Sequence, residues 1–367
     1  MATRSSPAAR QKAAPVAPAV PMPWLVGQLQ ALLQQQGHAL LLEGPSGLGQ
    51  FELGLAYASA VLCERQPAGA PLQPACGQCE SCHAIAVHTH PDLLVLLPEA
   101  LQQEWGWGAP DAESSGEAKR KPSKEIRIEA MRQMITFSQR TDARGRGKVV
   151  LIYPAESMNT VTANALLKTL EEPPGNSRFV LVSDASHRLL PTIRSRCHAW
   201  HMHWPRPEAV ASWLASSQGE AAPDGERLQA ALAAAGGRPQ DARQLLLAGF
   251  DGQSWRDLPR SIAHGEPALL AQVAPGAAIT MLQQLCHDVL TVLAGATPRY
   301  FPREAVAPLV PPAVLAQRPL RQRAFAQLTQ WGSELMAAAR TSEHPFSQEL
   351  MLAALVERAR SALHFRM

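Results

Sequence analysis

The sequence predicts an α/β module built on a parallel sheet, followed by helical domains. Over residues 39–203, short apolar runs alternate with longer helical stretches, and a glycine-rich loop directly follows the first apolar run. From residue 268 onward, apolar residues recur at helical spacing. Strands that alternate with helices form parallel sheets covered by helices on both faces. With 367 residues, the chain is long enough for two or three such domains.

The composition is that of a globular protein rather than a disordered one. Hydrophobic residues make up 46% of the chain and charged residues 18%. No apolar run approaches the ~18 residues of a membrane-spanning helix, and residues 1–22, rich in Ala and Pro, predict a flexible tail rather than a signal peptide. We therefore expect a cytoplasmic protein without a membrane partner. The net charge of +3 is too small to indicate nucleic-acid binding by itself.

The strands and helices can be placed in chain order. Short apolar runs predict strands at residues 39–42, 93–97, 149–153, 179–183 and 199–203. Helical stretches between them cover residues 51–63, 126–137 and 161–170. Residues 98–123 break the pattern with Gly, Ser, Glu and Lys around Trp105 and Trp107. We expect a mobile insertion there, and the sequence assigns no role to the two tryptophans.

The loop after the first strand is a phosphate-binding loop without its two decisive residues. It reads Gly44-Pro45-Ser46-Gly47-Leu48-Gly49-Gln50-Phe51, against the pattern G-x-x-x-x-G-K-[ST]. In an active loop the lysine neutralises phosphate oxygens and the hydroxyl ligates Mg²⁺. Gln50 brings no charge and Phe51 brings no oxygen. Taken alone, the pattern also fits an ordinary Gly/Pro turn.

A second acidic element that nucleotide hydrolysis requires is also missing. An active enzyme of this class ends the third strand with Asp-Glu, which hold the metal and polarise water. This strand ends with Tyr153-Pro154. Glu156 follows two positions later, and we interpret it as the polar cap of the next turn. Two independent losses therefore predict a loop that does not turn over ATP.

Four of the six cysteines are grouped with the spacing C-x12-C-x2-C-x2-C. Two-residue gaps let neighbouring thiolates bind one tetrahedral ion, and Gly77 supplies the turn between two of them. The spacing predicts a structural Zn²⁺ site, with a redox or disulfide role as the alternative. The predicted ligands are Cys63, Cys76, Cys79 and Cys82.

Several runs together resemble the clamp-loader branch of the AAA+ proteins. Residues 164–174 read NALLKTLEEPP and residues 192–197 read TIRSRC, while His90-Pro91-Asp92 precedes the second strand. The resemblance implies an AAA+ domain over residues 23–203, which carries the zinc module (63–82) and the insertion (98–123). It further implies a helical lid (204–252) and a helical collar (253–367).

The resemblance also implies roles for single residues. The arginine of Ser195-Arg196-Cys197 corresponds to the finger that clamp loaders offer to ATP on a neighbouring subunit; Arg194 lies close enough to be confused with it. Members that use ATP carry a sensor arginine in the lid, where this chain has Gln240, with Arg238 and Arg243 as alternative candidates for that role. We therefore expect no ATPase activity from the isolated chain, although it would be a subunit of a DNA-directed DNA polymerase holoenzyme.

A basic stretch is the candidate DNA contact. Residues 119–148 hold ten Lys/Arg against three Asp/Glu, and Arg127 and Arg132 fall on one predicted helix. Such a helix would contact phosphates without reading sequence. The alternative, a solvated basic face paired to local acids, is equally compatible with the sequence.

The resulting hypothesis is a non-hydrolysing subunit of the bacterial DNA polymerase III clamp loader. The implied partners are the ATPase subunits (gamma/tau), the delta subunit, the sliding clamp and primed DNA. Two alternatives stay open: an active ATPase subunit of the same complex, and a stand-alone zinc-containing DNA-binding protein.

Overall fold

A computed structural model describes residues 22–67, 69–107, 122–216, 224–341 and 348–365. Its first part is a five-stranded parallel sheet in the order β2-β3-β4-β1-β5. The strands are β1 (Ala39–Glu43), β2 (Leu93–Leu96), β3 (Lys148–Ile152), β4 (Ser177–Ser183) and β5 (His198–His201). These confirm the five predicted strands.

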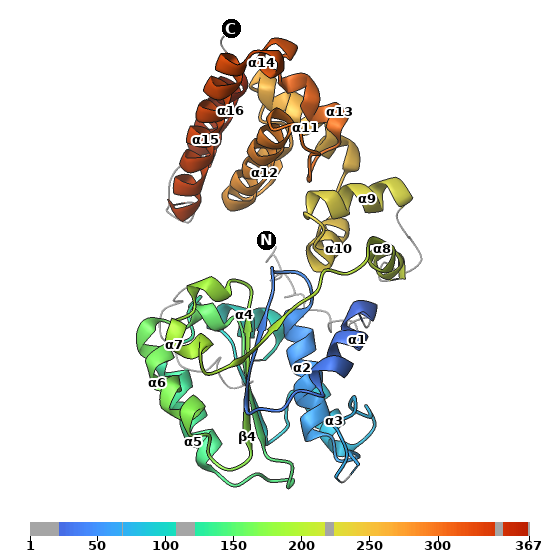
Figure 1. The fold of residues 1–367 in the computed structure, drawn as a ribbon, viewed down its shortest axis with the longest axis vertical. Helices are drawn as coiled ribbons and strands as arrows, with labels where there is room; N and C mark the ends of the chain where they lie inside the picture. The colour runs from blue at the N-terminus through green and yellow to red at the C-terminus, as the bar shows by residue number, and fades with distance from the viewer. Residues whose placement is uncertain (1–21, 68, 108–121, 217–223, 342–347, 366–367) are drawn as a thin grey trace, which may run out of the picture.

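The central strands are apolar because both faces of the sheet are covered. Every residue of β1 and β3 is buried, which is typical of parallel sheets with helices on both sides. One face packs against α1 (Pro23–Leu32) and α2 (Gln50–Leu62), and the other against α5 (Ile128–Gln139) and α6 (Thr160–Glu171). The sheet edge at the carboxyl end of β1 leads directly into the glycine loop (Figure 1).

Three shorter α-helices also lie among the described residues of this part. They are α3 (Glu80–Ala86), α4 (Glu99–Trp105) and α7 (Pro191–Arg194). The sequence did not predict α4, which occupies the start of the expected insertion. Residues 108–121 of that insertion, and residues 1–21 of the expected tail, lie outside the described residues.

Three helices follow the sheet and share its hydrophobic core. They are α8 (Pro207–Ser216), α9 (Gly225–Ala234) and α10 (Pro239–Leu247). Val210, Trp213 and Leu246 from these helices belong to the same cluster of buried side chains as Leu25 and Leu53. The helices therefore rest on the α1 and α2 side of the sheet.

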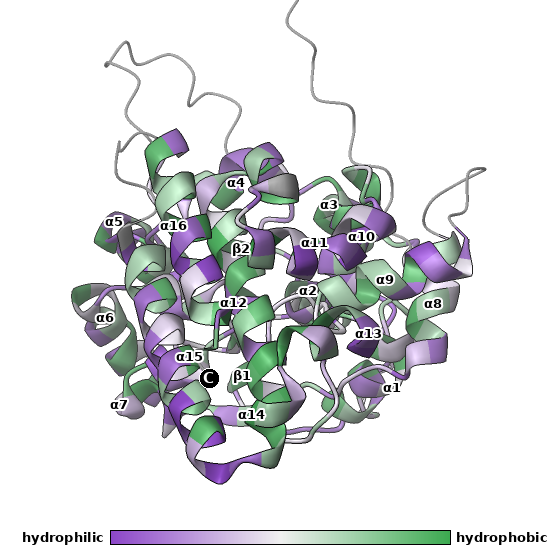
Figure 2. Cartoon of the chain, turned by 90° about the horizontal axis from the view of Figure 1, so that it is seen from above, coloured by the Kyte–Doolittle hydropathy of each residue, from purple (hydrophilic) through white to green (hydrophobic). Residues whose placement is uncertain are grey.

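The remaining helices surround a second core. They are α11 (Gly252–His264), α12 (Pro275–Leu293), α13 (Arg303–Val306), α14 (Pro312–Ala316), α15 (Arg318–Thr341) and α16 (Gln348–Leu363). Trp255, Leu285, Trp331 and Val356 are buried together there. Figure 2 shows hydrophobic and hydrophilic residues alternating along these helices, as expected for amphipathic helices in a bundle. Within the described part of the chain, none of the helices has the length and hydropathy needed to cross a bilayer.

Candidate functional site

The glycine loop lies between β1 and the first residue of α2. Gly47 and Gly49 have φ angles of +83° and +95°, which non-glycine residues adopt only with strain. A Cβ atom on Gly47 would lie 2.9 Å from Asp241 Oδ1, and one on Gly49 would lie 2.6 Å from Met22 Sδ. These two glycines are therefore needed for the loop shape and for close contact with neighbouring elements.

The side chain of Gln50 fills the inside of the loop. Its Nε2 donates hydrogen bonds to the carbonyl oxygens of Gly44 (3.0 Å) and Pro45. Its Oε1 accepts from the backbone N–H of Leu48 at 3.2 Å. In an active loop, such N–H groups bind phosphate oxygens. Here the side chain that replaces the lysine satisfies one of them, and Gln50 is only 2% exposed.

Asp184, at the end of β4, connects the loop to the third strand. It accepts hydrogen bonds from Gln50 Nε2 through Oδ1 (3.0 Å) and from the Tyr153 hydroxyl through Oδ2 (3.1 Å). Burial, followed by repulsion from Glu156, raises the pKa of Asp184 to about 6. The acid is thus held by two neutral donors rather than by the ammonium of a lysine.

The sequence suggested that Glu156 is only the polar cap of the next turn, but its carboxylate binds the end of β4. Its carboxylate accepts hydrogen bonds from the Ser183 hydroxyl (2.7 Å) and from the backbone N–H of Asp184 (3.1 Å). The physical reason is that β3 and β4 are adjacent parallel strands, so the turn after β3 brings Glu156 to the residues at the end of β4. Glu156 therefore fixes the position of Asp184.

Four aromatic rings pack together at the beginning of α2, those of Phe51, Trp105, Trp107 and Tyr153. The ring of Phe51 lies 5.0 Å from that of Trp105, 5.5 Å from that of Tyr153 and 6.1 Å from that of Trp107. Trp105 and Tyr153 are stacked with their centroids 5.7 Å apart. Phe51 and Tyr153, which the sequence analysis expected in place of metal ligands, thus pack with the two tryptophans of the expected insertion.

Helix α10 closes the loop from another side. The backbone N–H of Gln240 donates to Gly47 O (3.1 Å), and its side-chain amide donates to Glu52 Oε1 (2.6 Å). Burial is the largest effect on Glu52 and raises the pKa of its carboxyl. Gln240 stands at the place expected for a sensor arginine, and it forms hydrogen bonds with Gly47 and Glu52 of the same chain.

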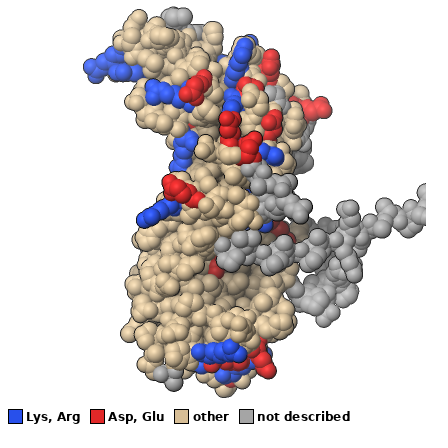
Figure 3. Space-filling view, turned by 90° about the vertical axis from the view of Figure 1, so that its right-hand side faces the viewer, with Lys and Arg blue, Asp and Glu red and all other residues tan. Residues whose placement is uncertain are grey.

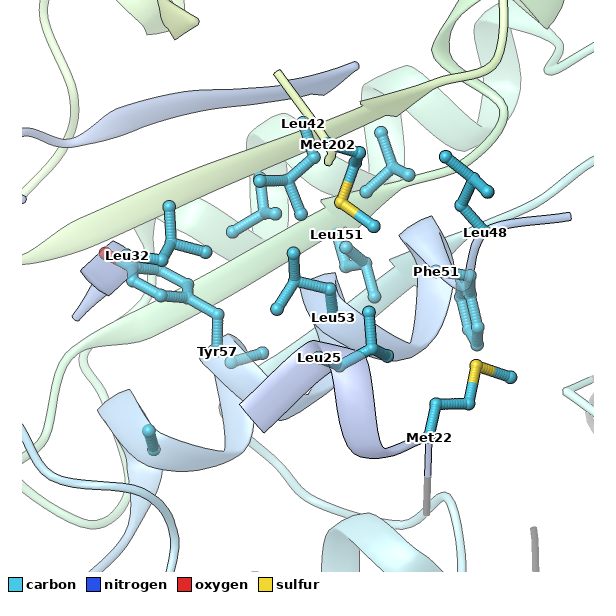
Figure 4. Packing of buried hydrophobic residues seen from close by; sticks show 14 of the residues in the cluster. Met22, Leu25, Leu32, Leu42, Leu48, Phe51, Leu53, Tyr57, Leu151 and Met202 are labelled. Carbon is cyan, nitrogen blue, oxygen red and sulfur yellow. The ribbon is translucent and has the colours of Figure 1, made fainter. Parts of the chain in front are cut away.

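Helix α1 covers the remaining side of the loop. The indole Nε1 of Trp24 donates to Leu48 O at 2.8 Å. Figure 4 shows Met22 and Leu25 beside Phe51 and Leu48, where α1 packs on the beginning of α2. The loop is thus surrounded by protein side chains from α1, α4 and α10.

Arg196, the expected finger, lies in the turn between α7 and β5. Its Nε donates to Glu171 Oε1 at 2.6 Å, a second guanidinium nitrogen also contacts this oxygen, and Nη1 donates to Thr192 O at 2.9 Å. Its side chain is 35% exposed. Arg194 is exposed on the same turn. The next residue, Cys197, is half-buried, and burial raises the pKa of its thiol to about 12.

The four grouped cysteines come together between α2 and α3. All four sulfur atoms lie within 4.8 Å of one another, with distances of 4.0 Å (Cys63 to Cys79), 3.9 Å (Cys76 to Cys82) and 3.4 Å (Cys79 to Cys82). A tetrahedral ion with ~2.3 Å bonds needs sulfurs about 3.8 Å apart. Gly77 makes the predicted turn with φ +69°. The donor set therefore fits a metal ion.

Much of the basic stretch is paired with acids or carbonyls near this cysteine module. Arg144 pairs with Glu64 and Glu80, and Arg146 donates to the backbone oxygen of Glu64 at 2.8 Å. Lys148 is buried 3.3 Å from Asp92. Figure 3 shows positive and negative side chains intermixed at the lower end of the molecule. This part of the stretch serves local structure.

The two candidate DNA-binding residues on α5 differ in their surroundings. Arg127, just before the helix, pairs with Glu99 at 2.8 Å. Arg132 is exposed on the helix. Residues 119–121 of the basic stretch lie outside the described residues.

Trp105, Trp107 and Asp184 are among the site residues that sequence reasoning missed. Asp184 had a usable signal, because it directly follows a buried strand at the same sheet edge as the glycine loop. The tryptophans had none, since only the tertiary fold brings them to Phe51.

Comparisons with known proteins support one family. The family model described as DNA polymerase III, delta subunit, matches residues 24–205. A DNA polymerase III subunit delta′ from Pseudomonas aeruginosa is 40% identical over 65% of this chain and 63% of its own length. A subunit tau from Escherichia coli is 30% identical over 59% of this chain and 30% of its own length.

One solved structure is similar over most of the chain. It is a DNA polymerase III gamma subunit-related protein from Thermotoga maritima, with 18% identity and a TM-score of 0.42, which covers 93% of this chain and 100% of the other. The chain matches about three fifths to two thirds of the length of the delta′ relatives from Pseudomonas aeruginosa and Escherichia coli.

Proposed function

Since residues 24–205 of this chain belong to the DNA polymerase III delta subunit family, we propose that it is a delta-prime-type subunit of the bacterial clamp loader. That complex opens a ring-shaped sliding clamp and places it on primed DNA. The observation that carries the proposal is the filled glycine loop, in which Gln50 binds the loop's own carbonyls and N–H group. Such a subunit would work in the cytoplasm with gamma/tau ATPase and delta subunits.

The subunit would not hydrolyse ATP itself. Hydrolysis needs a lysine for the phosphates, a hydroxyl and an acid for the metal, and an acid for the water. Gln50, Phe51, Tyr153 and Pro154 stand at these positions. The rival function, an active ATPase of the same complex, would require other residues to supply all four groups.

Arg196 would instead serve a neighbouring ATP site. A finger supplied in trans can increase a GTPase rate by ~10³ to 10⁵. The motif around Arg196 and its surface position support this role. In the isolated chain its guanidinium pairs with Glu171, so this contact would have to be exchanged for a phosphate when the neighbour docks.

The cysteine module and α5 would have supporting roles. We propose that Cys63, Cys76, Cys79 and Cys82 hold a structural zinc ion that ties the end of α2 to α3. We also propose that Arg132 contributes to the contact with DNA inside the complex. Arg127 is a weaker candidate because Glu99 neutralises it.

Arg196→Ala tests the proposed role in the reconstituted complex. The complex should assemble normally, while its DNA-stimulated ATP turnover falls by about tenfold or more because the charge on the transferring phosphate is less stabilised. Arg194→Ala, on the same turn, is the matched control and should retain most of the activity. Clamp loading at the normal rate by the Arg196 variant would refute the finger. Failure of the wild-type chain to bind the ATPase subunits would refute the proposed function itself.

A further inference from the structure

The aromatic cluster at the glycine loop has a feature that the loss of catalytic residues does not explain. The loss of the lysine already weakens phosphate binding, so the exclusion of nucleotide does not require aromatic side chains packed on the loop. Yet Trp105 and Trp107 approach Phe51 to centroid distances of 5.0 and 6.1 Å. Two large rings from another segment therefore pack on the place where α2 begins.

The position of the rings is informative. In an active loop, position 51 carries the hydroxyl that ligates the metal, and position 153, directly after β3, carries a carboxylate that also holds the metal. A metal ion with its phosphate would lie between these two side chains. The rings of Phe51 and Tyr153 are 5.5 Å apart, and Trp105 packs against both. This space is occupied by aromatic carbon.

The segment that brings the tryptophans is anchored at both of its ends. At the start, Glu99 Oε2 accepts from the backbone N–H of Ser123 (3.0 Å), and Ala100 N–H donates to Ser123 O (3.1 Å). At the end, the ring of Trp107 stacks on that of His88 with centroids 3.7 Å apart. These contacts hold the end of α4 against the loop from elements outside the cluster.

We infer that the end of α4 is an intramolecular occupant of the glycine loop. Trp105 and Trp107 pack on Phe51 and Tyr153 in the place of the metal and terminal phosphate, and they exclude nucleotide even when the lysine of the loop is restored. The inference rests on the proposed function in assuming that the loop descends from a nucleotide site. It adds a second, steric cause of exclusion, which is independent of the missing charge.

A factorial experiment on the isolated full chain separates the two causes. MgATP binding is measured by equilibrium dialysis for Gln50→Lys, for Trp105→Ala/Trp107→Ala, and for all three changes together. We expect that Gln50→Lys alone does not measurably increase the affinity for MgATP over that of the wild-type chain. The triple variant should bind MgATP at least tenfold more tightly than Gln50→Lys. Gln50→Lys combined with Trp204→Ala is the control, because Trp204 is 48% exposed and lies outside the cluster.

Two outcomes would overturn the inference. Gln50→Lys alone could gain as much affinity as the triple variant, or the triple variant could gain none. Either result would leave the proposed function intact, since assembly with the ATPase subunits is measured separately.

A second measurement uses only conservative replacements of single rings. In protein labelled with 5-fluorotryptophan, the ¹⁹F resonances of Trp105 and Trp107 are assigned with single Trp→Phe variants. Phe51→Leu should shift both resonances, because the ring current of Phe51 is lost, and should leave that of Trp204 unchanged. Unchanged resonances of Trp105 and Trp107 would show that the rings do not pack on the loop, and would also overturn the inference.

Discussion

The amide of Gln50 binds groups from the loop and the sheet at once. It donates to Gly44, Pro45 and Asp184, and it accepts from Leu48. A lysine at this place could donate but could not accept, so the N–H of Leu48 would lose its partner. A glutamine therefore suits a loop that holds its shape without phosphate.

Asp184 gives this arrangement a pH dependence. Its folded-state pKa of about 6 lies above the ~3.9 of an exposed aspartate. The protonated carboxyl of Asp184 therefore stabilises the folded state. This stabilisation is fully present below the unfolded-state pKa and is lost as the pH rises through the folded-state pKa.

Replacing Gln50 with lysine should reduce this loss of stability. An ammonium group beside Asp184 favours the carboxylate and lowers the pKa of Asp184. We expect the free energy of unfolding to fall less between pH 4.5 and pH 7 in Gln50→Lys than in Gln50→Met, as measured by urea titration at both pH values. An equal decline in the two variants would show that Asp184 is not the group responsible.

Apolar runs predicted the sheet because both faces of each central strand are buried. The five strands appear within two residues of their expected positions. Helix α4 was missed because its neighbours are Gly, Ser, Glu and Lys, which outweigh the helical pattern of residues 99–105. The sequence predicted that Phe51 replaces a metal-ligating hydroxyl, but it could not predict the packing of Phe51 on Trp105, which depends on contacts between segments that are distant in sequence.

The grouping of the four cysteine sulfurs was predictable from their spacing. Two-residue gaps and a glycine turn fix the positions of three sulfurs within one loop. What spacing could not predict is how the module is attached. Glu64, next to Cys63, accepts a hydrogen bond from Ser81 (2.8 Å) and pairs with Arg144, so the module is tied to the segment before β3.

The module should bind one zinc ion per chain. Cys76→Ser should lower the bound zinc measured by elemental analysis, because a hydroxyl is a poor zinc ligand, and should destabilise α3, since metal binding is coupled to local folding. Cys197→Ser should leave the zinc content unchanged, because Cys197 lies outside the cluster. Stable disulfides among the four cysteines, or wild-type protein without zinc, would contradict the metal site.

Three parts of the chain that are distant in sequence meet at the glycine loop. Helix α1 reaches it through Trp24, α4 through Trp105, and α10 through Gln240. In an active enzyme, nucleotide would bridge the sheet and the following helices. Here hydrogen bonds from Gln240 to Gly47 and Glu52 make that connection, so the helices after the sheet have a fixed contact that does not depend on nucleotide.

We propose that this protein fills its own glycine loop and does not use ATP. The most direct test is MgATP binding to the isolated wild-type chain, measured by equilibrium dialysis up to about 1 mM, the upper end of common KM values. We predict no saturable binding over this range. Saturable binding of one ATP per chain would contradict the claim, because Gln50, Trp105 and Gln240 would then have to leave the positions that they occupy in the structure.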